Sequence, residues 1–196
     1  MPTYVVTGRR QSGKTVMAID LLRQTEADAG ICMTTGGDVK YSWHTALERH
    51  VPPGFVYNTF DQAAVERLVT MANPKGRYFL AVDELPGNLP EHPSLTTIWS
   101  GAWSKVRREW KWDRLYVMQG SDNAPELYER LGPMPVSQEA FVDAYGRLEP
   151  YEALVVDRAT GELSSHRAAY PVPTFVKGGN FPTAGPDGRG TSGTSL

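Results

Sequence analysis

A strand, a glycine-rich turn and a helix follow one another at the start of the chain. The apolar run at residues 4–6 is followed at once by residues 8–15, which spell GRRQSGKT, and then by the helical pattern of residues 16–22. The turn matches the complete phosphate-loop pattern G-x-x-x-x-G-K-[ST]. This order restricts the chain to an α/β fold and predicts that it binds a nucleoside triphosphate.

The residue types of this loop suit a chain of phosphates. Gly8 and Gly13 let the backbone wrap closely around the anion, and the helix that follows directs its first N–H groups at it. We expect Lys14 to reach the β- and γ-phosphates and the Thr15 hydroxyl to ligate Mg²⁺. ATP is therefore predicted to bind along the whole loop, through Gly8, Arg9, Arg10, Gln11, Ser12, Gly13, Lys14 and Thr15.

Length and charge limit what else the protein can be. The 196 residues are enough for one domain with a substantial core. The formal net charge of −2 provides no global basic field, so contact with nucleic acid would need a local patch or an oligomeric ring. The sequence has neither a run of about 18 apolar residues nor an N-terminal leader pattern, which predicts no membrane anchor. The single cysteine, Cys32, fits a reducing compartment.

Short strands alternate with helical runs along the chain. This alternation predicts an α/β fold with a mostly parallel central sheet and helices on both faces. We expect strands at Thr3–Thr7, 31–34, 55–58, 78–82, Arg114–Met118, 153–156 and Leu163–Arg167. We expect helices at Lys14–Arg23, 61–71, 96–110 and Ala124–Leu131. Residues 1–177 form the predicted domain, and residues 178–196, rich in Gly, Pro, Ser and Thr, a predicted disordered tail.

An apolar strand that ends in two acidic residues forms a second motif. Residues 78–82, YFLAV, are nearly continuously apolar, as in a parallel strand covered on both faces, and Asp83 and Glu84 follow them. In this Walker B arrangement Asp83 would hold Mg²⁺ through a water, while Glu84 would deprotonate the water that attacks the γ-phosphate. The glutamate favours ATP hydrolysis and a RecA/ASCE-like P-loop NTPase fold, a three-layer sandwich.

A third element ends the strand at Arg114–Met118. Gln119 closes this strand, and a polar turn and a helical run follow. In ATPases of this architecture the strand after Walker B inserts between the other two, so Gln119 is expected beside Lys14 and Glu84 as a phosphate sensor. The alternative is a polar cap on a surface turn.

Three motifs follow one another along the chain: GRRQSGKT, then FLAVDE, then LYVMQ with the trailing SDNAPELYERLG. In that order they resemble the FtsK/HerA clade of ATPases, above all the small genome-packaging ATPases of double-jelly-roll DNA viruses, the poxvirus-like and tectivirus-like group. The resemblance covers roughly residues 3–157. It implies ATP hydrolysis with Mg²⁺, a hexameric or pentameric ring, double-stranded DNA and capsid or vertex proteins as partners, and a location in the host cytoplasm or the virion.

The segment at residues 105–114, KVRREWKWDR, is the one dense basic stretch of the sequence. The resemblance implies that Arg107 or Arg108 completes a neighbouring subunit's site, a contribution that can reach 10³–10⁵ in rate. The other interpretations are contact with DNA phosphates and a solvated helix face. An apolar stripe at helical spacing overlaps this segment and is expected in the core or at a subunit interface; it consists of Trp99, Trp103, Val106 and Trp110.

Other functions remain open at this point. A small-molecule kinase would use the same loop and could use Arg107 and Arg108 in a lid, but it does not require the pair Asp83 and Glu84. A filamentous-phage assembly ATPase of the Zot type usually carries a membrane anchor. A nucleotide-binding switch without turnover is disfavoured because Lys14 and the acidic pair are intact.

Overall fold

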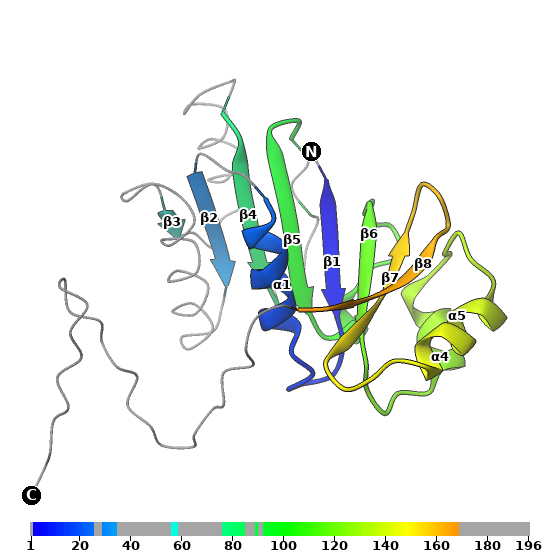
Figure 1. Ribbon diagram of the computed structural model, residues 1–196. Coiled ribbons are helices and arrows are strands. Elements are labelled where there is room, and N and C mark those ends of the chain that lie inside the picture. Colours follow the sequence, from blue (N-terminus) through cyan, green and yellow to red (C-terminus); the bar gives the residue numbers. More distant parts are fainter. Residues whose placement is uncertain are drawn as a thin grey trace, which may run out of the picture.

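The protein is described by a computed structural model that covers residues 2–25, 29–34, 56–58, 76–84, 89 and 92–168. In this part of the chain, eight strands form one sheet with the spatial order β3-β2-β4-β5-β1-β6-β7-β8 (Figure 1). The strands are β1 (Thr3–Thr7), β2 (Ala29–Thr34), β3 (Val56–Asn58), β4 (Tyr78–Asp83), β5 (Leu95–Gly101), β6 (Arg114–Met118), β7 (Glu152–Asp157) and β8 (Leu163–Arg167). All neighbours from β3 to β6 are parallel, and β7 and β8 are antiparallel.

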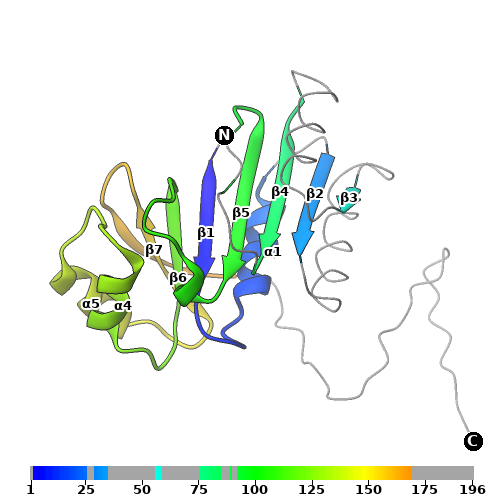
Figure 2. The same ribbon diagram turned by 180° about the vertical axis from the view of Figure 1, so that it is seen from behind.

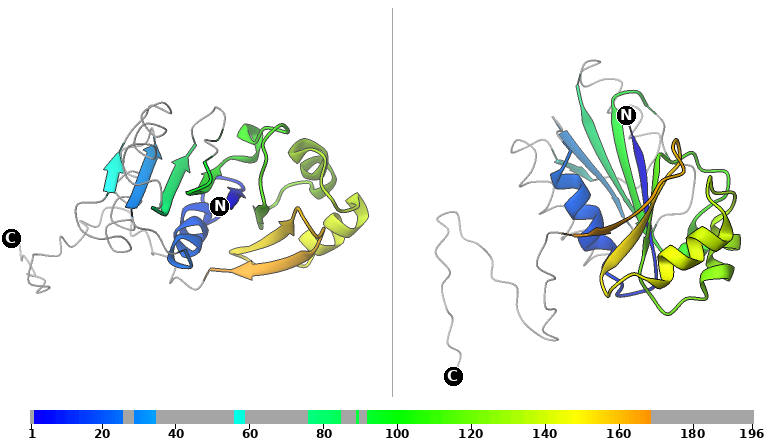
Figure 3. Two further views of the ribbon diagram at one scale, coloured as in Figure 1. Left: turned by 90° about the horizontal axis from the view of Figure 1, so that it is seen from above. Right: turned by 45° about the vertical axis from the view of Figure 1, so that its right-hand side comes forward.

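Helices cover both faces of this sheet. The helical elements are α1 (Lys14–Arg23), the 3₁₀ helix η1 (Trp103–Lys105), α4 (Ala124–Leu131) and α5 (Gln138–Gly146). Helix α1 lies on one face, and α4 and α5 lie on the other, beside β6 and β7 and far from β3 (Figures 2 and 3). The α/β class, the mostly parallel sheet and the three layers predicted from the sequence are therefore confirmed.

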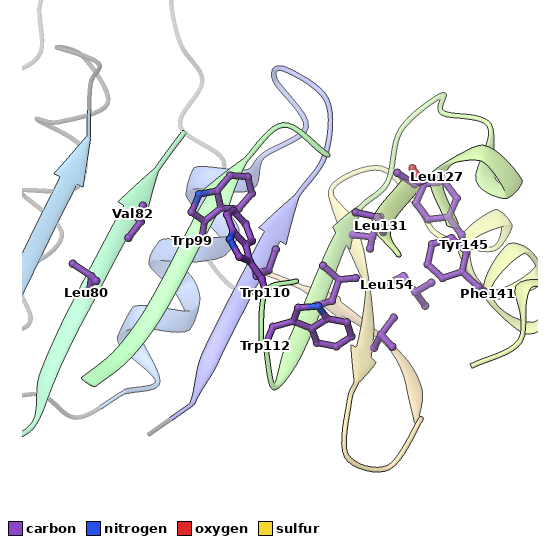
Figure 4. Close-up of a cluster of buried hydrophobic side chains, with 14 of the residues drawn as sticks. Leu80, Val82, Trp99, Trp110, Trp112, Leu127, Leu131, Phe141, Tyr145 and Leu154 are labelled. Carbon is purple, nitrogen blue, oxygen red and sulfur yellow. The ribbon is translucent and has the colours of Figure 1, made fainter. Parts of the chain in front are cut away.

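Alternating side chains of the strands divide the core into two clusters. On the α1 side, Val6, Phe79 and Ile98 pack with the helix residues Met17 and Leu22, all of them fully buried. On the other side, one buried cluster runs from Leu80 of β4 to Leu154 of β7, and at the Leu154 end it includes side chains of α4 and α5 (Figure 4). This division follows from the two-residue period of a strand, which sends neighbouring side chains to opposite faces.

Tryptophans form much of the second cluster. The rings of Trp99 and Trp110 meet edge to face with their centroids 4.9 Å apart, and both side chains are buried (Figure 4). Trp112 is also buried, and the guanidinium of Arg158 lies 5.3 Å from its ring centroid. The packing role predicted for Trp99 and Trp110 is confirmed.

The helix predicted at residues 96–110 is wrong. Strand β5 occupies Leu95–Gly101, and only η1 follows it before β6. All seven residues of β5 are buried, because the strand lies in the middle of the sheet between β4 and β1. A strand buried on both faces shows no alternation of apolar and polar residues. The helical spacing of Trp99 with Trp103 and Trp110, which follow the strand, therefore predicts a helix that does not form.

Helix α5 was not predicted, although its start carries a signal. Ser137 is the N-cap, and its side chain accepts a hydrogen bond from the backbone N–H of Ala140 at 3.2 Å. Asn123 caps α4 in the same way, accepting from the N–H of Glu126 at 3.3 Å. A capping residue followed by an acidic first turn is the usual mark of a helix start.

Several expectations concern other parts of the chain. The predicted helix at 61–71, the domain end at residue 177 and the tail at 178–196 lie outside the described residues. Among the residues that are described, no helix combines the length and the apolar character that crossing a bilayer requires.

Candidate active site

The predicted site residues gather at the carboxyl ends of the parallel strands. Strand β1 lies between β5 and β6, and its last residue, Thr7, pairs with Gly101 on one side and Val117 on the other. The chain leaves β1 toward β2 on one side of the sheet, while β6 lies on the other. Such a point, where the strand order changes direction, forms the ligand-binding crevice of open α/β sheets.

The loop after β1 has the backbone shape that a phosphate cradle needs. Gly13 is the N-cap of α1 with a φ of 90°, and Gln11 has a φ of 66°. A Cβ atom on Gly8 would lie 2.7 Å from the Cβ of Met118 and 2.7 Å from Oγ of Ser12, which is too close for any side chain. Glycine is therefore favoured at position 13 by the backbone conformation and at position 8 by the lack of room for a side chain.

One polar atom inside the loop is left without a partner. The Oγ of Ser12 is buried and forms no hydrogen bond within the described part of the chain. A buried hydroxyl without a partner is rare in a folded protein. Nearby, Nζ of Lys14 donates to the carbonyl oxygen of Arg9 at 2.6 Å, so an ammonium group lies against the loop. A hydroxyl and an ammonium both donate to phosphate oxygens, and this donor set fits the triphosphate predicted from the sequence.

Arg9 joins the loop to the turn that follows β6. Its Nε lies 2.6 Å from Oδ1 of Asp122, its Nη1 donates to Oγ of Ser121 at 2.7 Å, and its Nη2 donates to the Ser121 carbonyl oxygen at 3.2 Å. The Asp122 side chain is only 6% exposed, and its Oδ2 has no hydrogen-bond partner in the described residues. Arg9 therefore supplies the positive charge that this buried carboxylate needs.

Tyr145 of α5 lies behind the same turn. Its hydroxyl donates to the carbonyl oxygen of Met118 at 3.2 Å, and its side chain is buried. Burial raises the pKa of Tyr145 to about 12, and the negative charge of Asp122 adds to the effect. The neutral phenol thus keeps the end of β6 attached to α5 across the physiological range.

Strand β4 delivers the acidic pair to the same edge of the sheet. Asp83 pairs with Ser100 of β5, and Ser100 pairs with Val6 of β1, so Asp83 lies two strands away from the end of β1. Glu84 follows with a φ of 55°, and its backbone N–H donates to the Ser100 carbonyl oxygen at 2.8 Å. A positive φ is uncommon for a residue with a side chain, and such strained positions concentrate at functional sites.

Both carboxylate oxygens of Glu84 have partners. Oε1 accepts from the backbone N–H of Ala102 at 3.0 Å, and Oε2 lies 2.8 Å from Nζ of Lys105. Lys105 also donates to the Glu84 carbonyl oxygen at 3.2 Å. The side chains of Glu84 and Lys105 are 33% and 45% exposed. The lysine was missed as a site residue, because its contact with Glu84 depends on where β5 ends.

The expected insertion of the Gln119 strand is wrong. The strand between β1 and β4 is β5, whereas β6, which precedes Gln119, lies on the opposite side of β1. The observed strand order differs from the expected one because residues 95–101 form a strand, whereas the sequence predicts a helix at 96–110. Gln119 still reaches the loop edge, where its N–H donates to the Glu152 carbonyl oxygen at 2.7 Å. Its role as a phosphate sensor remains a prediction.

Two arginines of the basic stretch point to neighbouring parts of the same chain. Arg107 lies 3.6 Å from Glu109, and the guanidinium of Arg108 donates to the carbonyl oxygen of Glu129 in α4. Both arginine side chains are exposed. They lie in the connection between η1 and β6, so the predicted helix face does not exist, and a role toward another subunit or DNA remains a prediction.

The remaining loop residues differ in exposure. Arg10 is exposed, whereas Thr15, in the first turn of α1, is partly buried. Thr15 follows Lys14 directly and is the second residue of α1. That Thr15, and Asp83 through a water, hold Mg²⁺ stays a prediction.

Comparisons with known proteins identify solved structures of the same fold. Neither a protein-family model nor a curated protein sequence matches the chain. The structure of the genome packaging NTPase B204 from Sulfolobus turreted icosahedral virus 2 in complex with AMP matches with a TM-score of 0.56 and 15% identity, over 86% of this chain and 98% of that one. The complex of that NTPase with AMPPCP matches with a TM-score of 0.52 and 15% identity over the same shares.

A crystal structure of B204 from Sulfolobus turreted icosahedral virus, a DNA-packaging ATPase, matches as well. Its TM-score is 0.51 and its identity 13%, over 86% of this chain and 98% of that one. The match spans nearly the whole length of each B204 chain. The chain therefore has the P-loop NTPase fold of these viral genome-packaging NTPases, as the resemblance of its motifs implied.

Proposed function

We propose that the protein is an ATPase that moves double-stranded viral DNA into a capsid as a ring of identical subunits. One observation carries this proposal: a phosphate loop with an unpartnered buried hydroxyl at Ser12 shares a sheet edge with Glu84. The fold of the packaging NTPase B204 around this edge supports the same function. The small net charge of −2 requires that DNA contact be local or come from a ring.

Each residue at the carboxyl ends of β1 and β4 has its own role in ATP hydrolysis. Lys14 and the loop N–H groups bind the phosphates, and the hydroxyl of Ser12 offers one more donor. Thr15, and Asp83 through a water, would hold Mg²⁺, which would neutralise charge on the β- and γ-phosphates. Glu84 accepts a proton from the water that attacks the γ-phosphorus, and the bond to the β-phosphate oxygen breaks to give ADP and phosphate.

Glu84 must reach the attacking water for this step. In the structure one oxygen accepts from Ala102 and the other pairs with Lys105. A general base must lie within hydrogen-bond reach of the proton it accepts. We propose that Lys105 moves away from Glu84 before water is activated, so that this ion pair slows hydrolysis when no partner is bound.

The subunit interface supplies the remaining charge. Arg107 and Arg108 are exposed on the connection that leads from η1 to β6, and we assign one of them to the γ-phosphate of a neighbouring subunit or to DNA phosphates. Gln119 is assigned to sensing the phosphate from the β6 side of the loop. A ring of these subunits would engage capsid or vertex proteins in the host cytoplasm.

Product analysis with single variants tests the enzyme class. We expect ATP to give ADP and inorganic phosphate, Lys14→Ala to lose nucleotide binding, and Glu84→Gln to keep binding while turnover falls by about two orders of magnitude or more. Arg147→Ala, at an exposed ion pair of α5 with Asp143, is the matched control and should behave as wild type. Transfer of the phosphate to an added nucleoside or nucleotide would instead identify a small-molecule kinase.

A further inference from the structure

Tyr151 combines exposure with a strained backbone. It is the one large hydrophobic side chain in the described residues that stands exposed, at 51%, and its φ is 68°. An aromatic residue with a positive φ is a genuine outlier, because its Cβ crowds the backbone. Such strain persists where the surrounding structure imposes it, most often at ligand sites.

The ring of Tyr151 lies beside the phosphate loop. A Cβ atom placed on Gly13 would be 3.6 Å from Cδ1 of Tyr151 and 3.7 Å from Cε of Met118. Gly13 is the N-cap of α1, where the loop ends. The tyrosine ring and the methionine methyl group therefore form an apolar surface next to the point at which the loop meets its helix.

Hydrogen bonds fix the turn that presents this ring. The N–H of Glu152 donates to the Glu149 carbonyl oxygen at 3.0 Å, and the N–H of Glu149 donates to Oε2 of Glu152 at 2.8 Å. The Glu152 carbonyl oxygen accepts from the N–H of Gln119 at 2.7 Å. The turn is thus closed on itself and tied to the end of β6, so the backbone position of Tyr151 is set before any ligand arrives.

The two sides of the loop have different characters. Glu84 and Lys105 lie toward β5 and β4, on the side where the terminal phosphate is cleaved. Tyr151 precedes β7, on the other side of β1, beyond β6. The base and the terminal phosphate are at opposite ends of a nucleotide. If the terminal phosphate lies on the Glu84 side of the loop, the base lies on the Tyr151 side. The flat face of a purine can stack on an exposed aromatic ring.

We propose that Tyr151 is the platform on which the nucleobase of the bound nucleotide stacks. This inference rests on the proposed function of the loop and adds a specific contact for the base. In this role the exposed ring offers a stacking surface, and the positive φ is the backbone conformation that presents it. Gly13 and Met118 place the ring next to the phosphate loop. A ring with only a packing role would be buried rather than half exposed.

The test compares two ligands that share phosphates and differ in the base. Equilibrium binding of a non-hydrolysable ATP analogue and of inorganic tripolyphosphate is measured by calorimetry for wild type, Tyr151→Gly and Tyr151→Phe. Glycine suits a φ of 68°, so Tyr151→Gly removes the ring without straining the backbone. We expect this variant to bind the analogue roughly ten-fold more weakly, the usual scale of base–aromatic stacking, with the tripolyphosphate affinity unchanged. Tyr151→Phe should keep most of the analogue affinity.

Each other result has a defined meaning. Equal affinity of wild type and Tyr151→Gly for the analogue would overturn the assignment, and so would an equal loss for both ligands, which would mean that the ring shapes the loop. If wild type binds neither ligand, the proposed function itself fails, an outcome that is distinct from failure of the Tyr151 assignment alone.

Discussion

At the scale of residues, the Glu84 carboxylate is held by its contacts with neighbouring groups of the site. Its backbone adopts a φ of 55°, and its carboxylate is held by the Ala102 N–H and by Lys105. Ion pairs between partly exposed side chains contribute about 0.5–1 kcal/mol. We expect a conformational change at a subunit interface to overcome an energy of this size and release Glu84. Without that change, the ion pair is strong enough to slow hydrolysis.

Removal of the Lys105 ammonium should therefore accelerate idle hydrolysis. We expect Lys105→Met to raise DNA-free ATP turnover roughly two- to five-fold, the rate equivalent of about 0.5–1 kcal/mol. Lys105→Arg keeps a positive charge at the same place and serves as the matched control. A fall in turnover for Lys105→Met, with nucleotide affinity unchanged, would show that Lys105 assists Glu84 instead of restraining it.

Tyr145 predicts a loss of stability at high pH. Its pKa in the folded protein is raised from 10.0 to about 12, so its contribution is fully present below pH 10 and is lost as the pH rises through 12. After allowance for solvent screening, we expect about 1–2 kcal/mol of the alkaline decline in unfolding free energy to come from this group. Urea unfolding of wild type and Tyr145→Phe between pH 8 and about 12 measures it.

Tyr145→Phe also loses the hydrogen bond to Met118, so its stability at pH 8 should be lower by about 0.5–1.5 kcal/mol. The prediction concerns how steeply the unfolding free energy of each protein falls with pH above pH 8. Parallel curves for the two proteins would mean that Tyr145 titrates normally in the folded state. Tyr4 and Tyr116, whose pKa values are also raised by burial, remain in both proteins and cancel in the comparison.

At the scale of elements, the loop between β1 and α1 is joined to the turn between β6 and α4. The joint consists of Arg9 with Ser121 and the buried Asp122. These two segments are more than a hundred residues apart in the sequence, and they meet because β6 pairs with β1. A change at the β6 turn can thus reach the phosphate loop through one guanidinium group.

Loss of Arg9 should destabilise the fold as well as the loop. Arg9→Ala leaves the carboxylate of Asp122 buried and unpaired, and we expect it to lower the unfolding free energy by about 1–3 kcal/mol. The double variant Arg9→Ala with Asp122→Asn should recover part of this loss, because no buried charge remains. Arg147→Ala, at an exposed pair, should cost under about 0.5 kcal/mol. Additive effects of the two site substitutions would refute the coupling.

Local sequence signals were sufficient for some elements and not for others. The β1 strand, the loop and α1 were predicted because Gly8, Gly13 and Lys14 have a fixed spacing along the chain. Strand β5 was not, because burial of all its residues removes the alternation that marks a strand. The capping signal of α5 at Ser137 was present in the sequence but was not used.

Local sequence signals predict some contacts of the site and not others. The positions of Asp83 and Glu84 at the loop edge follow from a strand motif. The pairing of Lys105 with Glu84 joins residues 21 apart across a strand and a 3₁₀ turn, so it could not be predicted while residues 96–110 were taken as a helix. Contacts between distant segments depend on the order of the strands, which a single sequence constrains only weakly.

At the scale of the whole molecule, the arrangement favours an enzyme that depends on a partner. The sheet brings the loop and the acidic pair to one edge, and Arg107 and Arg108 are exposed on the connection from η1 to β6. Within the described chain, Glu84 is held by Lys105 and Ala102. Fast turnover should therefore require assembly and DNA.

The most direct test measures steady-state ATP hydrolysis with and without double-stranded DNA, at low and moderate salt. The comparison includes wild type, Glu84→Gln and Arg107→Ala with Arg108→Ala. We expect DNA to stimulate wild type, with less stimulation as salt screens the phosphate contacts. We expect Glu84→Gln to abolish turnover, and mixing it with the arginine variant to restore part of the activity at shared interfaces. Turnover that ignores DNA at every salt concentration, from a protein that stays monomeric, would contradict the DNA-translocating ring.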